Sequence, residues 1–397
     1  MTYREEMLAA IAGRPTARIP WAPRMDLWCI ARRARGDLPA EFDGLNTAEI
    51  AAVLDVACHA VRADFTLPRE PQSLVLRGLG IDNHPDFPYR VELRGLPVEF
   101  RHDAENQWTR IRAPAGEVST HLKQTAAMTQ EGISLPFVLD YAMRTPDDFE
   151  AVAQVFEHLE VIPTPEAYAT FRARVGEGGL AVAGAPIAAS PVHLILHELV
   201  AMDQFFYLYA DARPQMDELA ARMEPYFEAC LEAVASCEAE VVFWGGNYDR
   251  NLTWPPFFEE RIAPWLKRVG ERLHAAGKYL LTHTDGENEG LMPLYRECAF
   301  DVAESVCPAP MTQLSLAELR QGMGEEIAIW GGIPSVALMG DSMDAAAFES
   351  YIDAMFESLG DGRHLILGVS DNVPPDADLD RLERIKQRIE TFGPVPG

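Results

Sequence analysis

The sequence predicts an α/β protein, specifically a (β/α)8 TIM barrel with an inserted antiparallel β segment in its N-terminal half. Three observations lead to this fold class. Short β-rich runs alternate with helical stretches through the second half of the chain, each of these runs ends in polar or small residues, and the length of 397 residues lies within the range of barrels. Strand–helix alternation predicts a parallel sheet covered by helices.

The alternation consists of five consecutive strand–helix units. The predicted strands cover 239–246, 278–286, 300–308, 327–335 and 364–372. The predicted helices cover 257–277, 290–299, 314–324, 343–360 and 376–392. An open doubly wound sheet would also gather its strand ends, but along a line at a switch point. The steady spacing of the five units favours the barrel.

The first half of the chain is less regular. We expect a first strand within 17–26 and another over 180–190, followed by a helix over 192–209. Residues 89–125 alternate apolar and polar side chains and contain turn residues, which indicates antiparallel strands inserted beside the barrel. No long linker interrupts the sequence, so we predict one domain over 1–397.

Composition limits the classes of partner. The chain has 34 Lys and Arg against 61 Asp and Glu, for a net charge of −27. So acidic a protein is not expected to bind nucleic acid or an anionic membrane, because both require a basic surface. Six scattered cysteines, no apparent signal peptide and no run of 18 apolar residues predict a cytoplasmic protein with reduced thiols. A homodimer is compatible with the sequence.

The segment THTDGENEG follows a predicted buried strand. His283 and Asp285 are two residues apart, so on a strand both side chains point to one face. Glu304 and Cys307 end the next strand, where a glutamate is costly to bury unless it is paired or bound to metal. Together the four residues form a mixed N, O and S ligand set for Zn²⁺ or a similar ion. The alternatives are a hydrogen-bonded His–Asp pair and a cysteine that fills the core.

A second polar cluster lies in FWGGNYDRNLTWPP. Asn247, Tyr248 and Asp249 follow a strand and two glycines, which allow a ligand to approach the backbone closely. We predict that they line the substrate pocket, with Asp249 and Tyr248 catalytic and with Asn247 and Trp244 binding substrate. The alternative is a structured turn that contains an Asp–Arg pair.

Common motifs of other enzyme classes are absent. The sequence contains no phosphate-binding loop, no GxGxxG after a strand and no GxSxG. His193 and His197 are four residues apart, which is a metal-binding spacing on a helix, but the order HExxH is missing. We therefore expect these two histidines to face neighbouring elements.

Several segments of the chain, in this order, resemble the uroporphyrinogen decarboxylase superfamily, which also contains corrinoid-dependent methyltransferases. The segments are YREEMLAAIAGRPTARIPWAP, APAGEVST, LAVAGAPIAAS, FWGGNYDRNLTWPPFFEERIAPWLKRV, KYLLTHTDG and LILGVSDNVPPDADLDRL. The resemblance covers nearly the whole chain and implies a (β/α)8 barrel whose active site lies at the carboxyl ends of the strands.

The resemblance is greatest to the methyltransferase and O-demethylase branch. In its thiol-methylating members Zn²⁺ is held by the His and Cys of H-x-C and by a later Cys. His283 matches that His, whereas Asp285 and Ser370 stand in place of the two cysteines. The related O-demethylating enzymes bind Zn²⁺ with carboxylate-containing sets. The resemblance thus implies a small methylated substrate, most suitably an O-methyl compound, and a corrinoid on a separate protein as methyl acceptor.

The decarboxylase branch is the alternative. Its members use an Arg-rich "RQAGR" stretch, where this chain has APRMDLWCIARR. Arg24 lies in that stretch, and we predict that it binds substrate. This alternative is a decarboxylase without metal. A third alternative is a barrel that binds a ligand and has no catalytic activity.

Overall fold

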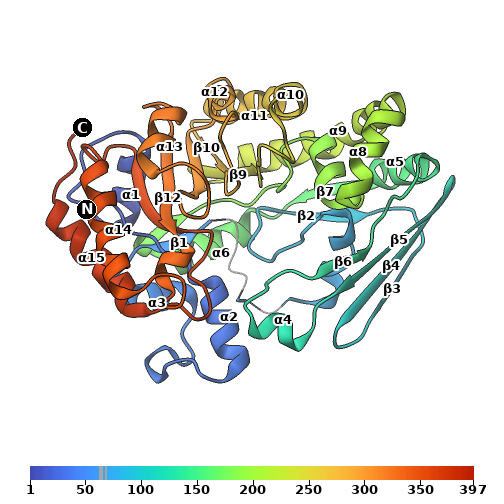
Figure 1. Ribbon diagram of the computed structural model, residues 1–397. Coiled ribbons are helices and arrows are strands. Elements are labelled where there is room, and N and C mark those ends of the chain that lie inside the picture. Colours follow the sequence, from blue (N-terminus) through green and yellow to red (C-terminus); the bar gives the residue numbers. More distant parts are fainter. Residues whose placement is uncertain (62–65, 68) are drawn as a thin grey trace.

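The computed structural model describes residues 1–61, 66–67 and 69–397, and its centre is a five-stranded parallel sheet (Figure 1). The strand order is β13-β12-β11-β10-β9, so each strand lies beside its neighbour in sequence. All five strands predicted for the second half are therefore confirmed. Their bounds are β9 Val241–Gly246, β10 Tyr279–His283, β11 Val302–Val306, β12 Ala328–Pro334 and β13 Leu365–Ser370.

Helices follow these strands as the alternation predicts. Local signals explain their ends: α13 begins with a capping box between Ser315 and Glu318, and α14 begins with Asp344 as its N-cap. Helix α15 buries Leu382, Ile385 and Ile389, a spacing that forms one apolar face. The bounds are α11 Ala263–Ala275, α12 Met292–Tyr295, α13 Leu316–Met323, α14 Ala345–Ser358 and α15 Leu379–Phe392.

Two short strands continue the parallel arrangement. Strand β1 (Cys58–Ala60) pairs with β8 (Gly179–Ala181). Isolated parallel bridges then connect the flanking segments to the two edges of the large sheet, Trp21 to Leu367 and Ala183 to Val242. The strand expected within 17–26 is reduced to the bridge at Trp21, because the nearby prolines 20 and 23 lack N–H donors. Eight regular strands in one closed sheet are thus not seen in the described residues.

The predicted antiparallel insertion is present and is longer than expected. Strands β3, β4 and β5 form consecutive hairpins, and the unit extends to residue 163 because β6 pairs with β5 and β7 pairs with β2 in a separate two-stranded sheet. In Figure 1 this unit lies at the end of the molecule remote from both termini. Its strands are β2 Tyr89–Leu93, β3 Val98–His102, β4 Asn106–Ala113, β5 Gly116–Lys123, β6 Phe137–Asp140 and β7 Leu159–Pro163.

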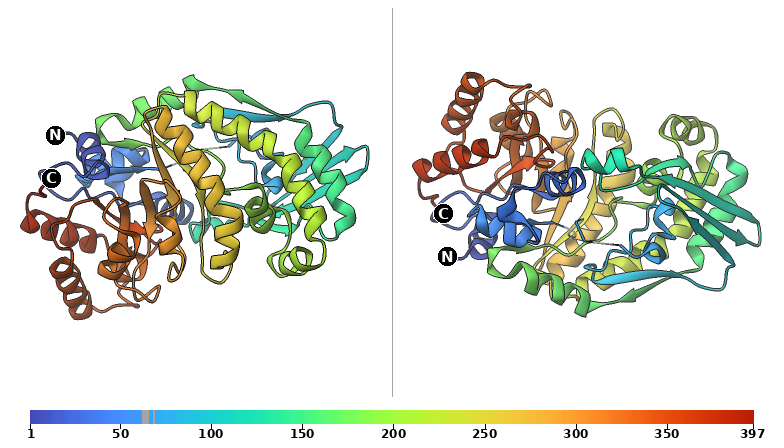
Figure 2. Two further views of the ribbon diagram at one scale, coloured as in Figure 1. Left: turned by 90° about the horizontal axis from the view of Figure 1, so that it is seen from above. Right: turned by 90° about the horizontal axis from the view of Figure 1, so that it is seen from below.

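The helix predicted over 192–209 is interrupted. A π-helical turn, Ile195–Leu199, follows α7, and the extended backbone of Val200 separates it from α8. The long helix α9 lies beside α11 along one side of the molecule (Figure 2). The remaining helices are α1 Tyr3–Ile11, α2 Asp26–Arg35, α3 Thr47–Val53, α4 Ala126–Gln130, α5 Phe149–Glu157, α6 Pro165–Val175, α7 Pro191–Leu194, α8 Met202–Asp211, α9 Arg213–Ser236 and α10 Pro255–Phe257.

Within the described residues, none of the helices combines the length and the apolar character that a membrane crossing requires.

Candidate functional site

Polar side chains from three strands meet at the carboxyl end of the parallel sheet. His283 is the last residue of β10 and lies directly opposite Glu304 of β11. Asp371 follows β13, which is separated from β11 by β12. The glycine at 331 in β12 leaves room for the backbone of β11 and for the Ser370 hydroxyl, because a Cβ there would lie 2.7 Å from the Val306 nitrogen and 3.1 Å from the Ser370 oxygen. The Ser370 hydroxyl accordingly donates to the Val306 carbonyl at 2.6 Å.

His283 lies among three carboxylates. Its Nδ1 is 2.5 Å from an oxygen of Glu304, and its Nε2 is 3.5 Å from Asp285 and 4.0 Å from Asp371. Only 10% of the His283 side chain and 2% of the Glu304 side chain are exposed. Both ring nitrogens of a nearly buried imidazole therefore face acidic oxygens, an environment that stabilises positive charge, either on the imidazole itself or on an ion bound among the carboxylates.

The ionisation of these groups reflects their mutual charges. Burial alone would raise the pKa of Glu304, but the imidazoles of His283 and His59 lower this pKa well below its usual value. Burial alone would lower the pKa of His283, but Glu304 and Asp285 raise it well above the usual value. For Asp371 the effect of burial is outweighed by Arg24, which lowers the pKa of this carboxyl. Neighbouring positive charge therefore keeps Glu304 ionised although it is buried, and it also favours the ionised form of Asp371.

Two further residues complete the cluster. Nε2 of His59, in β1, lies 2.9 Å from the second oxygen of Glu304, and the ring packs edge-on against Trp330. Arg24 donates to Asp371 at 2.9 Å and to Asp26 at 3.1 Å. Sequence analysis did not identify His59 or the role of Asp371. The only sign of His59 in the sequence is its position within a short apolar run, 58–61, and this sign is weak.

The residues that could hold a metal differ from the predicted set. Ligand atoms of His283, Glu304 and Asp371 all lie within 4.8 Å of one another, and this is the group of metal-ligating side chains found in the described part of the chain. Asp285 lies beside His283 but outside that group.

Cys307, predicted as a metal ligand, also stands outside the group. It follows the end of β11, and its backbone carbonyl accepts from the Thr312 hydroxyl in the next turn. Burial, together with Asp285 and Asp371, raises the pKa of its thiol to about 12. A metal ligand would have to be the thiolate, which this environment disfavours. The structure thus replaces Cys307 by Asp371 in the candidate set.

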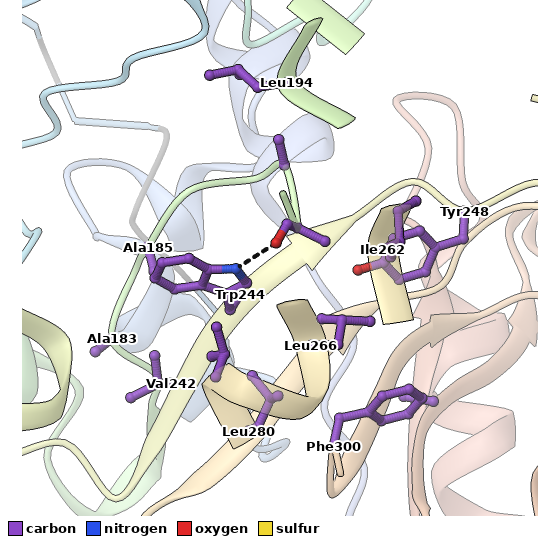
Figure 3. Packing of buried hydrophobic residues seen from close by; sticks show 14 of the residues in the cluster. Ala183, Ala185, Leu194, Val242, Trp244, Tyr248, Ile262, Leu266, Leu280 and Phe300 are labelled. Atoms are coloured by element: carbon purple, nitrogen blue, oxygen red, sulfur yellow. Dashed lines mark hydrogen bonds between the residues drawn. The ribbon is translucent and has the colours of Figure 1, made fainter. Parts of the chain in front are cut away.

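Trp244 and Tyr248 lie in the core, not in a pocket (Figure 3). The indole N–H of Trp244 donates to the Ala189 carbonyl at 3.1 Å, and the Tyr248 hydroxyl is 2.8 Å from that of Thr282. Neither side chain is exposed, so neither can contact a substrate in this conformation. Burial raises the pKa of Tyr248, which further opposes proton transfer by its hydroxyl. In this conformation both side chains pack in the core, so the structure gives no support to their predicted catalytic and substrate-binding roles.

Asn247 and Asp249 remain near the strand end. Asn247 has a left-handed backbone (φ 60°), and its N–H donates to the His283 carbonyl at 2.9 Å, which holds it beside the cluster. The two oxygens of Asp249 accept the backbone N–H groups of Asn251 and Glu287, at 2.8 and 3.1 Å. Asp249 thus joins two loops of the site, as in a structured turn, although Arg250 pairs with Glu289 and not with Asp249.

We expect Asp249→Ala to lower the free energy of unfolding by about 1–2 kcal/mol, because two charge-assisted hydrogen bonds are lost. Asp249→Asn keeps one acceptor oxygen and should lose less. Urea unfolding of both variants measures this order. An Asp249→Asn variant that has the same free energy of unfolding as the unaltered protein but is inactive would instead support the predicted catalytic role.

Comparisons with known proteins bear on the fold. No protein-family model matches the chain, and no curated protein matches its sequence. Among solved structures, a methyltransferase from Methanosarcina mazei matches with a TM-score of 0.56 and 14% identity, over 99% of this chain and 99% of that chain. A crystal structure of D-psicose 3-epimerase in the presence of D-fructose matches with a TM-score of only 0.34 and 11% identity, over 60% and 85% of the two chains. At such identities a likeness concerns the fold alone, and over nearly its whole length this chain shares the fold of the methyltransferase.

Proposed function

We propose that the protein is a methyltransferase that moves a methyl group from a small O-methyl substrate to the corrinoid of a separate protein, assisted by a divalent metal. The observation that carries the proposal is the meeting of His283, Glu304 and Asp371 at the carboxyl ends of parallel strands. The fold shared with a methyltransferase supports it. The resemblance to the uroporphyrinogen decarboxylase superfamily supports the proposal too. The same resemblance supports a (β/α)8 barrel built from the two parallel sheets and the bridges between them.

The donor atoms fit a divalent ion. One imidazole and the carboxylates of Glu304 and Asp371 converge, with Asp285 as an additional oxygen donor, and such N/O sets suit Zn²⁺ or a harder ion. A bound ion would supply Lewis acidity to the oxygen that the methyl group leaves. This set has no thiolate, so it suits an oxygen leaving group better than thiol activation.

The chain's own residues fix the site. Glu304 holds one nitrogen of His283 and also accepts from His59, so the imidazole cannot rotate freely. Arg24 holds Asp371 from the other side. In the transfer, the substrate oxygen would retain the electron pair of the broken C–O bond and take a proton from water. A Co(I) corrinoid, when bound as the acceptor, would supply the electron pair for the new bond to carbon.

The test is a spectroscopic assay with reduced cobalamin and a panel of small methyl ethers. We expect Co(I) absorbance to decay only when protein and a suitable ether are both present. Glu304→Gln should slow the decay by about 10- to 100-fold, as loss of a ligand or of its support does at metal sites. Cys307→Ser serves as the matched control and should retain the rate. Absence of decay with every ether, together with metal-independent decarboxylation of a porphyrinogen, would replace the proposal by the decarboxylase alternative.

A further inference from the structure

A second chain of polar residues lies beside the candidate metal site. The Arg77 guanidinium donates to Glu198 at 2.9 Å, the other oxygen of Glu198 is 3.0 Å from Nδ1 of His197, and Nε2 of His197 is 2.8 Å from the Asn247 amide nitrogen. These contacts link three distant parts of the sequence. Within the described part of the chain, the side chains of these four residues form no hydrogen bond or ion pair with the carboxylates around His283.

The chain runs from a buried ion pair to a partly exposed end. The Arg77 and Glu198 side chains are 9% and 7% exposed, whereas His197 is 24% exposed. His197 and Glu198 belong to the π-helical turn Ile195–Leu199, a local irregularity that often occurs at functional sites. The backbone N–H of Asn247 donates to the His283 carbonyl, so the exposed end of the chain adjoins the strand end that carries His283.

The two hydrogen-bond partners of His197 indicate which tautomer this arrangement requires. An amide nitrogen can only donate, so Nε2 of His197 accepts from Asn247 and the ring proton lies on Nδ1, which donates to Glu198. Glu198 is ionised: burial alone would raise its pKa, but Arg77 and His197 lower it to about 2. In this arrangement the Nε2 lone pair of His197 points away from the ion pair and accepts a hydrogen bond from the Asn247 amide.

We propose that His197 and Asn247 form a substrate subsite that takes a neutral hydroxyl group, with Glu198 and Arg77 as positioning residues. A hydroxyl donates to Nε2 and accepts from the Asn247 amide, so it can replace the present bond without leaving either group unsatisfied. An ammonium group cannot accept, and a carboxylate cannot donate. Resting on the proposed function, the inference specifies the substrate as a methyl ether that also carries a free hydroxyl.

Binding is tested without turnover, on the full chain labelled with ¹⁵N-histidine. His197→Phe assigns the His197 signals, and we expect them to show the neutral Nδ1–H tautomer. The probes are 2-methoxyethanol and 1,2-dimethoxyethane, which differ by a single methyl group on one oxygen. We expect 2-methoxyethanol to shift the Nε2 signal and 1,2-dimethoxyethane to leave it unchanged at the same concentration. Equal shifts, no shift with either probe, or an Nε2–H tautomer would overturn the subsite.

Turnover then separates the subsite from the proposed function. In the cobalamin assay, His197→Phe should lower the preference for 2-methoxyethanol over 1,2-dimethoxyethane by about tenfold, the effect of one hydrogen bond. In the double variant Arg77→Met, Glu198→Leu, His197 should populate both tautomers. This variant should therefore also show a reduced preference for 2-methoxyethanol over 1,2-dimethoxyethane. A shift of the His197 signal without corrinoid turnover supports the subsite and overturns the proposed function. Corrinoid turnover in which His197→Phe keeps the unaltered preference for 2-methoxyethanol supports the proposed function and overturns the subsite.

Discussion

Replacement of His283 by alanine is expected to lower the divalent metal content of the purified protein from about one ion per chain to less than about 0.1 per chain. His283 is the nitrogen donor among the converging residues, and Glu304, Asp285 and Asp371 all lie within 4.0 Å of its ring nitrogens. Without the imidazole, the carboxylates lose the group that holds them around one point. Elemental analysis after purification without chelator measures the loss.

Two matched variants locate the ligands. Asp371→Asn should also reduce the metal content, because Asp371 belongs to the converging group, whereas Cys307→Ser should retain it. The opposite result, with metal lost on replacement of Cys307 and kept in Asp371→Asn, would restore the ligand set expected from the sequence. Metal below about 0.1 per chain in the unaltered protein would remove the metal from the proposed function.

The sequence predicted the parallel sheet well because its signal is local. Each of the five strands of the second half is an apolar run, and helices α13, α14 and α15 each begin with a side-chain N-cap. Adjacency of His283 and Glu304 followed from the same reasoning, since consecutive parallel strands in register bring their ends together. The interrupted strand around Trp21 was less predictable, because its only regular contact is one bridge.

The remaining parts of the site depend on contacts that sequence spacing does not encode. Cys307 seemed equivalent to Glu304 because both end the same strand, but β11 stops at Val306 and the cysteine turns into the following loop. Asp371 reaches the cluster across β12 beside Ser370, whose hydroxyl contacts β11 in the space that Gly331 leaves without a side chain. Trp244 in β9 and Tyr248 just after it were predicted to act in a substrate pocket, yet both side chains are buried and their polar atoms are hydrogen-bonded within the core.

Long-range polar pairs are the hardest to predict. Arg77 and Glu198 are 121 residues apart, and neither position carries a motif. Nothing in the spacing of His193 and His197 indicates that His197 turns toward Glu198 and Asn247. Only the three-dimensional structure reveals that a buried ion pair supports one accessible imidazole.

That ion pair leads to the second large effect. Arg77→Met should lower the free energy of unfolding by about 3–5 kcal/mol, because it leaves the carboxylate of Glu198 buried without its partner. The double variant Arg77→Met, Glu198→Leu removes both charges and should recover most of that loss. Urea unfolding of the three proteins at neutral pH measures the difference. Equal destabilisation by the single and double variants would show that side-chain packing, and not the uncompensated charge, is responsible.

The pH dependence of stability identifies the same pair independently. The pKa of Glu198 is about 2 in the folded protein, below the usual value of 4.5. A lowered pKa stabilises the folded state at pH values above about 4.5, and this contribution of about 3 kcal/mol is lost as the pH falls toward 2. The unaltered protein should therefore lose stability more steeply between pH 4.5 and 2 than the double variant, which lacks the carboxyl group. Parallel curves for the two proteins would mean that Glu198 titrates normally and that Arg77 does not stabilise its charge.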